Sequence, residues 1–280
     1  MTVLPDLEWF DALGDRVRAL LMGHFDRLGD GDVELKRRRD LLTVADTAAE
    51  AMIVEAIRAD FPEHSILAEE SGADIRSSEF CWIVDPVDGT TNFARSLPMF
   101  AASVALCRLG EPVLAMVEGA RLGERFLAAK GGGAFLNGER IEVSGAEGVS
   151  TALLATGFAY VRNEVERDNV DNFNRLILAS HDIRRGGAAS LDLAYVAAGR
   201  LDGFWEPYLK PWDVAAGALL VREAGGVVSD FSDGEDWLFG ENIVADNGLF
   251  PAELLGQLSP VEAGREPWGR EIEARLRGGA

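Results

Sequence analysis

Two aspartates at the end of an apolar segment are spaced so that both carboxylates could take part in the same chemistry. The apolar run 82–84 leads into Asp85, and Asp88 follows three residues later. Both carboxylates can converge at one edge of a sheet, and Gly89 and Thr90 then offer backbone N–H groups to an anion at an expected helix start. Mg²⁺ prefers carboxylate and carbonyl oxygens, without sulfur or imidazole. The segment therefore predicts a divalent-cation site beside an anion site, with a simple capped turn as the alternative.

Further acidic residues fit the same site. Glu69 and Glu70 follow a short apolar stretch, and Asp213 stands in the first turn of an expected helix, where the helix dipole favours a carboxylate. Taken alone, the glutamate pair is typical of a solvated turn and Asp213 of an ordinary helix start. Together with Asp85 and Asp88, they form an oxygen-only set of candidate ligands.

Two competing kinds of catalysis do not match the sequence. Phosphatases that form a covalent aspartyl-phosphate use the first aspartate of Asp-x-Asp-Gly-Thr as nucleophile, and Pro86 stands at that position. Nucleophilic serine or histidine chemistry is also disfavoured, because His24, His64 and His181 lie outside every motif. Neither kind of nucleophile is therefore expected.

The charge of the chain limits its partners. Among 280 residues, 47 acidic side chains outnumber 27 basic ones, which gives a formal net charge of −20. Such a surface repels phosphate backbones and anionic lipid, so neither nucleic acid nor a membrane is expected as a partner. A small anionic substrate is still compatible, because a bound cation inverts the local field. No run approaches the ~20 apolar residues of a membrane span.

The two cysteines bear on the compartment. Cys81 and Cys107 each lie in an apolar run and are expected to be buried free thiols. The N-terminal residues show neither the basic start nor the apolar core of a signal peptide. Both observations favour the cytoplasm, where thiols stay reduced.

Helices and strands of the first half must position the acidic residues. Helical spacing of apolar residues predicts helices over 6–28 and 44–60, and apolar runs predict strands over 65–68, 80–84, 101–109, 112–119 and 125–130. Pro86 is expected to end its strand, and Asn137-Gly138 is a hairpin-turn signal. The basic stretch 34–40 is predicted as a solvated loop; a mobile loop that attracts an anionic substrate is the alternative. This half is expected to be a helix pair with a meandering antiparallel sheet.

The second half alternates helices and strands. Helices are predicted over 163–179, 188–199 and 212–224, and strands over 153–155, 182–184, 201–206, 227–229 and 243–245. That alternation predicts α/β layering. We expect an N-terminal half over 1–145, with the Glu/Asp motifs, and a C-terminal half over 146–280, which together form one compact catalytic unit. The last fifteen or so residues are predicted as a surface helix.

Three segments together resemble the inositol monophosphatase family of Mg²⁺-dependent, lithium-sensitive phosphomonoesterases. They are residues 68–71, 85–93 and 212–226; residues 42–46 and 202–206 match further family positions. The likeness runs from about residue 7 to 260. It implies an α/β fold, an α+β layered sandwich of alternating helix and sheet layers as in the sugar phosphatase superfamily. An antiparallel-sheet half would then pack beside a second α/β half, with the site between them.

The resemblance also implies a role for each matching residue. Glu69, Asp85 and the Val87 carbonyl would hold a first Mg²⁺, and Asp85, Asp88 and Asp213 a second, with two or three ions in each site. Asp46 and Thr90 would orient the attacking water, so that the catalytic residues are Glu69, Asp46 and Thr90. The residues implied to contact substrate are Asp88, Gly89, Thr90, Gly187, Ala188, Ala189, Glu206 and Asp213.

One stretch departs from the family pattern. The family tends to have Gly-Ser/Thr-Ala-Ala where this chain has Gly187-Ala188-Ala189-Ser190, so a hydroxyl is missing at 188 and one appears at 190. The basic run 36–39 also differs, although Lys36 can take the place of the usual lysine. Both departures concern the identity of the substrate and leave the expected chemistry unchanged.

The function implied by the resemblance is hydrolysis of a small phosphorylated metabolite, by default inositol 1-phosphate. Within the family, histidinol phosphate, fructose 1,6-bisphosphate and 3′-phosphoadenylates are alternative substrates. Thr91 favours the inositol type, since some relatives carry lysine there. A non-catalytic regulatory or binding protein on the same fold is the alternative of another class. A homodimer is expected, because dimers are usual in the family.

Overall fold

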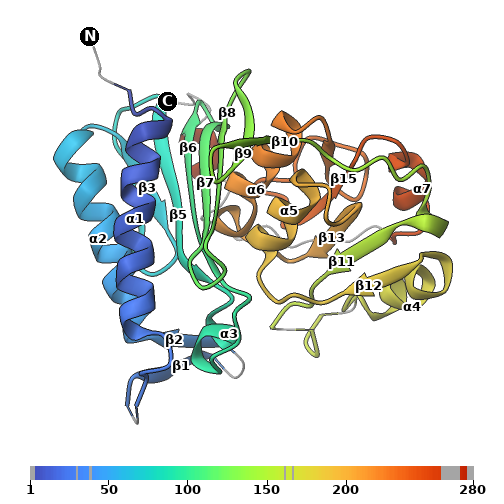
Figure 1. Cartoon of the computed structure of the whole chain (residues 1–280), viewed down its shortest axis with the longest axis horizontal. Coiled ribbons are helices and arrows are strands. Elements are labelled where there is room, and N and C mark those ends of the chain that lie inside the picture. The colour runs from blue at the N-terminus through green and yellow to red at the C-terminus, as the bar shows by residue number, and fades with distance from the viewer. Residues whose placement is uncertain are drawn as a thin grey trace.

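Two large sheets alternate with layers of helices in the computed structural model, which describes residues 4–29, 31–37, 40–160, 162–165, 167–259 and 272–275. The helices α1 and α2 cover one face of the first sheet, and α5 and α6 lie between the two sheets (Figure 1). The helices α4 and α7 pack on the far side of the second sheet. This helix–sheet–helix–sheet–helix order confirms the expected layered α/β fold.

The first helix layer consists of α1 (Leu7–His24) and α2 (Val44–Asp60), close to the ranges that helical spacing predicts. The Asp6 side chain accepts a hydrogen bond from Trp9 N at 3.0 Å and so begins α1. This helix ends four residues earlier than expected, because Phe25 is already extended with ψ of 136° and Asp26 after it is left-handed with φ of 61°. Phe25 nevertheless stays buried against the sheet.

The first sheet has eight strands in the order β10-β9-β8-β7-β6-β5-β3-β4. Their bounds are β3 (Ser65–Ala68), β4 (Gly72–Asp74), β5 (Phe80–Asp88), β6 (Ala101–Arg108), β7 (Glu111–Gly119), β8 (Glu124–Ala129), β9 (Gly133–Leu136) and β10 (Glu139–Ile141). The expected antiparallel meander is confirmed from β5 to β10, and Asn137-Gly138 forms the turn between β9 and β10. The strand β3 instead pairs with β5 in parallel, because the chain between them returns to the same end of the sheet.

The second half builds a sheet in the order β12-β11-β13-β15-β14, with parallel pairing on one side of β13 and antiparallel pairing on the other. Its elements are η1 (Val149–Thr151), β11 (Leu153–Thr156), α4 (Val170–Ala179), β12 (Asp182–Arg184), α5 (Ala189–Ala197), β13 (Gly203–Pro207), α6 (Pro211–Glu223), β14 (Val227–Ser229), β15 (Asn242–Asp246) and α7 (Pro251–Leu255).

Two expectations about local structure are wrong. The helix predicted over 163–179 begins only at Val170, because Asn169 before it is left-handed with φ of 72°. The stretch 34–40 contains a hairpin of β1 (Val33–Arg37) and β2 (Asp40–Thr43) in place of a loop; residues 38–39 lie outside the described part. The predicted C-terminal surface helix agrees with the structure where it is described: residues 272–275 are helical, with Ile272 packed on the core and residues 274–275 exposed.

The apolar core follows the layers. One cluster joins α1 and α2 to the first sheet, a second lies around α5 and α6 between the sheets, and a third lies under α4 and α7. Cys81 and Cys107 are buried free thiols, as expected, and face each other across β5 and β6. Within the described residues, none of the helices is long and apolar enough to cross a membrane. The division of the chain near residue 145 stays a prediction.

Candidate active site

A β-bulge brings the two aspartates of the β5 motif to the same face of the sheet. Residues three apart in a regular strand point to opposite faces. Asp85 pairs with Ser103 of β6 and Asp88 with Ala101, so three steps on β5 match two on β6. The extra residue turns Asp88 to the side of Asp85. The strand therefore continues through Pro86, contrary to the sequence-based expectation, and proline is tolerated at the bulge.

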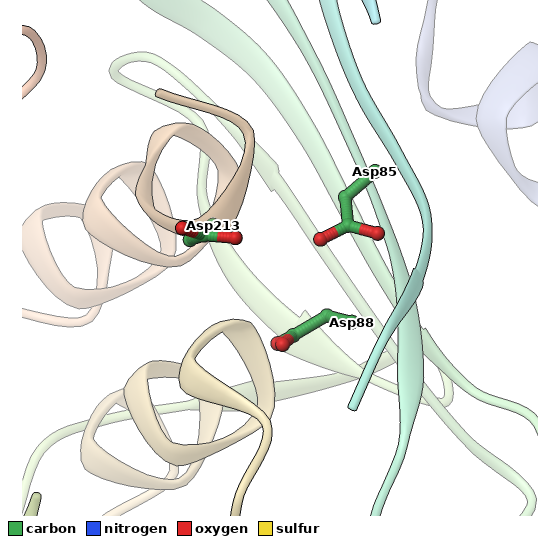
Figure 2. A group of neighbouring side chains, drawn as sticks. All are labelled: Asp85, Asp88 and Asp213. Carbon is green, nitrogen blue, oxygen red and sulfur yellow. The ribbon is translucent and has the colours of Figure 1, made fainter. Parts of the chain in front are cut away.

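Asp213 approaches the same place from the other half of the chain. The helix α6 begins at Pro211, and the Asp213 carboxylate accepts a hydrogen bond from Lys210 N at 2.7 Å. Figure 2 shows Asp85 and Asp88 pointing from the strand towards Asp213 at the start of this helix. One oxygen of each carboxylate lies within 4.8 Å of one oxygen of the other two. These three aspartates are called the acidic triad below.

Burial and mutual repulsion raise the pKa values of the acidic triad. Burial raises the pKa of Asp85 and of Asp213 well above the usual range, and the neighbouring carboxylates raise both further. Burial also raises the pKa of Asp88 to about 6, against hydrogen bonds from Ser190 that lower it. A cation placed among the three would remove this penalty. An oxygen-only set of this charge fits Mg²⁺.

Glu69 lies beside the triad and is held by two neighbouring elements. Its charge helps to raise the pKa of Asp85, and burial raises the pKa of Glu69 itself to about 7. The Lys36 ammonium of β1 donates to Glu69 Oε1 at 3.0 Å and also contacts Glu70. The pair is thus partly buried and bonded to Lys36, so the interpretation as a freely solvated turn is wrong.

Glu50 of α2 fixes the turn that carries Glu69, and sequence analysis missed it. Its two carboxylate oxygens accept the backbone N–H groups of Glu70 and Ser71 at 2.8 and 2.7 Å. Glu50 is buried and stands four residues after Asp46, on the apolar face of α2. A carboxylate on the apolar face of a helix was the available signal.

Asp46 and Thr90 meet at the edge of the triad. Thr90 Oγ1 lies 3.0 Å from Asp46 Oδ1 and 2.9 Å from the Val87 carbonyl, and its one hydrogen can serve only one of them at a time. Its lone pairs stay open to a hydrogen bond from water. Asp46 Oδ2 accepts Thr43 N at 2.9 Å in a capping box that begins α2. These contacts can orient a water molecule beside the triad.

We expect Asp46→Asn to lower turnover about 10- to 100-fold, as partners one step removed from a metal typically do. The amide would donate to Thr90 Oγ1, so that it would occupy one of the two lone pairs open to water and would no longer accept the Thr90 proton. Steady-state phosphate release measures the effect. Asp60→Asn, at the other end of α2, is the matched control and should keep full turnover. Equal turnover in the two variants would remove Asp46 from the site.

The segment 187–189 lies against Gly89, and its role in substrate binding stays a prediction. Gly89 is left-handed with φ of 87°, and a Cβ there would lie 3.0 Å from Met99 O and 3.2 Å from Gly187 O. Only glycine therefore fits before the short helix α3 (Thr90–Ala94). The Ala188 side chain is buried at the same contact.

Glu206 of β13 is a buried carboxylate, with 8% of its surface exposed. Burial raises its pKa well above the usual range, and the charge of Arg185 opposes that rise. Gly157 gives it room, since a Cβ at 157 would lie 2.1 Å from Glu206 Oε2. The alternative interpretation of Glu206 as a solvated strand-end residue is wrong.

Comparison with known proteins assigns nearly the whole chain to one family. The model of the inositol monophosphatase family matches residues 8–261. The chain belongs to the inositol monophosphatase family. The resemblance of the motif segments is thereby confirmed, and the family makes a phosphatase the first hypothesis for function.

Relatives of this family member carry two kinds of name. The protein called Nus factor SuhB from Escherichia coli is 46% identical over 224 residues, which cover 80% of this chain and 84% of the relative. A chloroplast phosphatase of Arabidopsis thaliana, IMPL1, is 40% identical over 82% of this chain and 64% of its own. The inositol monophosphatase structure from Anabaena is 38% identical, with a TM-score of 0.81 over 90% of this chain and 96% of its own.

Asp192 is a second buried acid near the acidic triad that sequence analysis missed. It is 3% exposed on α5, and burial, followed by the charge of Asp88, raises its pKa to about 8. Arg185 lies close enough to oppose that rise, and the N–H of Gly186 bonds to the carboxylate. A single acid within the apolar run 191–198 was the available signal.

We expect Asp192→Asn to stabilise the protein at pH 8 more than at pH 5. The raised pKa means that the folded chain keeps a proton that the unfolded chain releases above the ordinary aspartate pKa of 3.8. That contribution to the free energy of unfolding is complete below about pH 4 and is lost as pH rises towards 8. Asparagine has no such loss. Urea unfolding at both pH values measures it, with Glu63→Gln at an exposed position as control; a pH-independent difference would contradict the assignment.

Proposed function

We propose that this protein hydrolyses a small phosphomonoester in a Mg²⁺-dependent reaction, with inositol 1-phosphate as the first substrate to test. The convergence of Asp85, Asp88 and Asp213 within 4.8 Å carries the proposal. Family membership supports it, because relatives include named phosphatases. An anionic substrate can approach this acidic protein only if bound cations offset the negative charge of the triad. A Mg²⁺-dependent reaction meets that condition.

Each side chain has a defined part in the proposed reaction. Asp85, Asp88 and Asp213 would hold Mg²⁺, together with Glu69 and the Val87 carbonyl. When bound, such ions polarise a phosphate oxygen and make water a stronger nucleophile. Thr90 Oγ1 accepts a hydrogen bond from the attacking water and is itself held by Asp46. The backbone of Gly89 and Thr90, at the start of α3, can contact phosphate oxygens.

The identity of the preferred substrate distinguishes the alternative activities within the family. A panel of inositol 1-phosphate, histidinol phosphate, fructose 1,6-bisphosphate and a 3′-phosphoadenylate, assayed for phosphate release with and without Mg²⁺, tests the proposal. We expect Mg²⁺-dependent release with the highest kcat/KM for inositol 1-phosphate. A lack of release from every member would refute the catalytic function. A homodimer in the cytoplasm remains our prediction for the assembly and its compartment.

Glu206→Gln should lower kcat/KM for a polyol phosphate. The loss should correspond to about one to two kcal/mol of transition-state stabilisation, as loss of a charged hydrogen bond does. Its buried carboxylate can accept hydrogen bonds from substrate hydroxyls, and a site built for a hydroxyl discriminates strongly. A simple aryl phosphate presents no hydroxyl there, so its kcat/KM should change little. Both substrates are measured on the same variant. Equal losses would leave selectivity with residues 187–190.

A regulatory role is the second candidate, favoured by the name Nus factor that relatives at 46% identity carry. Such a role does not need hydrolysis. Expression of this chain, and of its Asp213→Asn variant, in Escherichia coli lacking SuhB tests the two candidates. Complementation by both would support a role independent of the triad; complementation by the unchanged chain alone would connect that role to the acidic site.

A further inference from the structure

The hydroxyl that stands two residues later than the family pattern contacts the acidic triad. Ser190 Oγ donates to Asp88 Oδ2 at 2.6 Å, and Ser190 N donates to the same oxygen at 2.7 Å. The serine lies in the first turn of α5 and is fully buried. These bonds connect a residue of the second half to a candidate metal ligand of the first.

Several donors from α5 converge on one carboxylate. Both groups of Ser190 meet the same oxygen, Oδ2, and the backbone of Ala189 helps to lower the pKa of Asp88. A carboxylate has about four acceptor positions, so two donors on Oδ2 occupy that oxygen and leave Oδ1 for a cation. Asp88 is therefore restrained to a single orientation, with its remaining acceptor capacity available to the side where Asp85 and Asp213 lie.

The Ser190 hydroxyl has no competing structural task among the described residues. The residue that precedes α5, Ala188, has no side-chain group to cap the helix, and the Asp88 carboxylate accepts both the Ser190 N–H and the Ser190 hydroxyl. A serine inside the first turns of a helix often bonds to the carbonyl of its own preceding turn. Here the hydroxyl instead crosses to a strand of the other sheet.

We propose that Ser190 is a positioning residue, whose hydroxyl holds the Asp88 carboxylate in the orientation that serves Mg²⁺. The proposal depends on the proposed metal centre. Removal of the hydroxyl leaves the backbone bond from Ser190 N in place, so Asp88 stays near its site but turns more freely. The cost should therefore appear in metal affinity first, and in substrate affinity only weakly.

Magnesium binding by the substrate-free protein tests this inference. We expect Ser190→Ala to raise the calorimetric Kd for Mg²⁺ about 10-fold, in the range found for partners that orient a ligand. In assays, the Mg²⁺ concentration for half-maximal rate should rise by the same factor. The KM for phosphate ester at saturating Mg²⁺ should stay within about twofold, a separation that a general loss of structure would not produce.

Ser65→Ala is the matched control. Ser65 is also fully buried, and its hydroxyl accepts Arg76 N at 2.9 Å, but it lies at the beginning of β3, away from the triad. It should bind Mg²⁺ like the unchanged protein. An unchanged Kd in Ser190→Ala, or equal losses in both variants, would overturn the positioning role and leave the proposed function standing. If the unchanged protein binds no Mg²⁺, the metal centre and the positioning role fail together.

Discussion

Phosphate release should stop in excess EDTA and return when Mg²⁺ is added back. The cations that the triad and Glu69 would hold are what could activate the attacking water and stabilise the leaving oxygen, and without a cation these carboxylates repel phosphate. The expected loss is complete within the sensitivity of the assay. It is measured on one protein sample with a preferred phosphomonoester, before chelation, after chelation and after restoration of Mg²⁺.

Chelation must leave the fold intact for this result to count. Circular dichroism in EDTA should match that of the untreated protein, because the apolar clusters that hold the layers together do not involve the triad. Full activity in excess EDTA would exclude the metal hypothesis. Inhibition by lithium, expected from the family, is a narrower matter: indifference to lithium would bear on the subfamily alone.

Asp213→Asn should lower turnover at least ~10²-fold, because several kcal/mol of charge stabilisation depends on the metal it helps to hold. Asp88→Asn should lose as much. The amide oxygen at 213 can still accept Lys210 N, so α6 should begin at the same residue and the fold should persist. Single-turnover phosphate release and Mg²⁺ calorimetry measure the loss.

Asp246→Asn is the control for these changes, since it replaces another buried aspartate by its amide. Asp246 lies on β15 opposite Gly203, whereas Glu206 of the same strand pair lies opposite Ile243, nearer the site. Its turnover should be unchanged. Normal turnover by Asp213→Asn with Mg²⁺ still bound would mean that the site does not span the two halves.

Motif spacing predicted which acidic residues would matter, and long apolar periods predicted most of the elements. The helix at 44–60 and the strands over 65–68 and 227–229 match the structure because each has a strong local pattern. The left-handed Asn169 could not be predicted in that way. Its side chain accepts the Trp205 indole N–H at 2.9 Å and donates to Gly157 O at 2.8 Å, contacts between distant segments that decide where α4 begins.

The parts of the site that sequence missed depend on similar long-range contacts. Glu50 binds a turn twenty residues away, and Ser190 reaches Asp88 over a separation of 102 residues. Neither partner is visible from local pattern, although the buried position of a polar residue on an apolar helix face hints at one. The pairing of Lys36 with Glu69 likewise depends on the β1–β2 hairpin, where the sequence predicts a loop.

The bulge in β5 also bears on how the chain selects the right strand register while it folds. If β5 paired with β6 regularly through residue 88, the Asp88 carboxylate would turn to the face that packs against α1 and α2. That face holds Val87, Phe93 and Phe100, among which an unpaired carboxylate is costly to bury. Pro86 adds to this penalty, because it has no N–H to donate to a continuous ladder. The misregistered sheet is therefore disfavoured by the same segment that carries the chemistry, before any metal is bound.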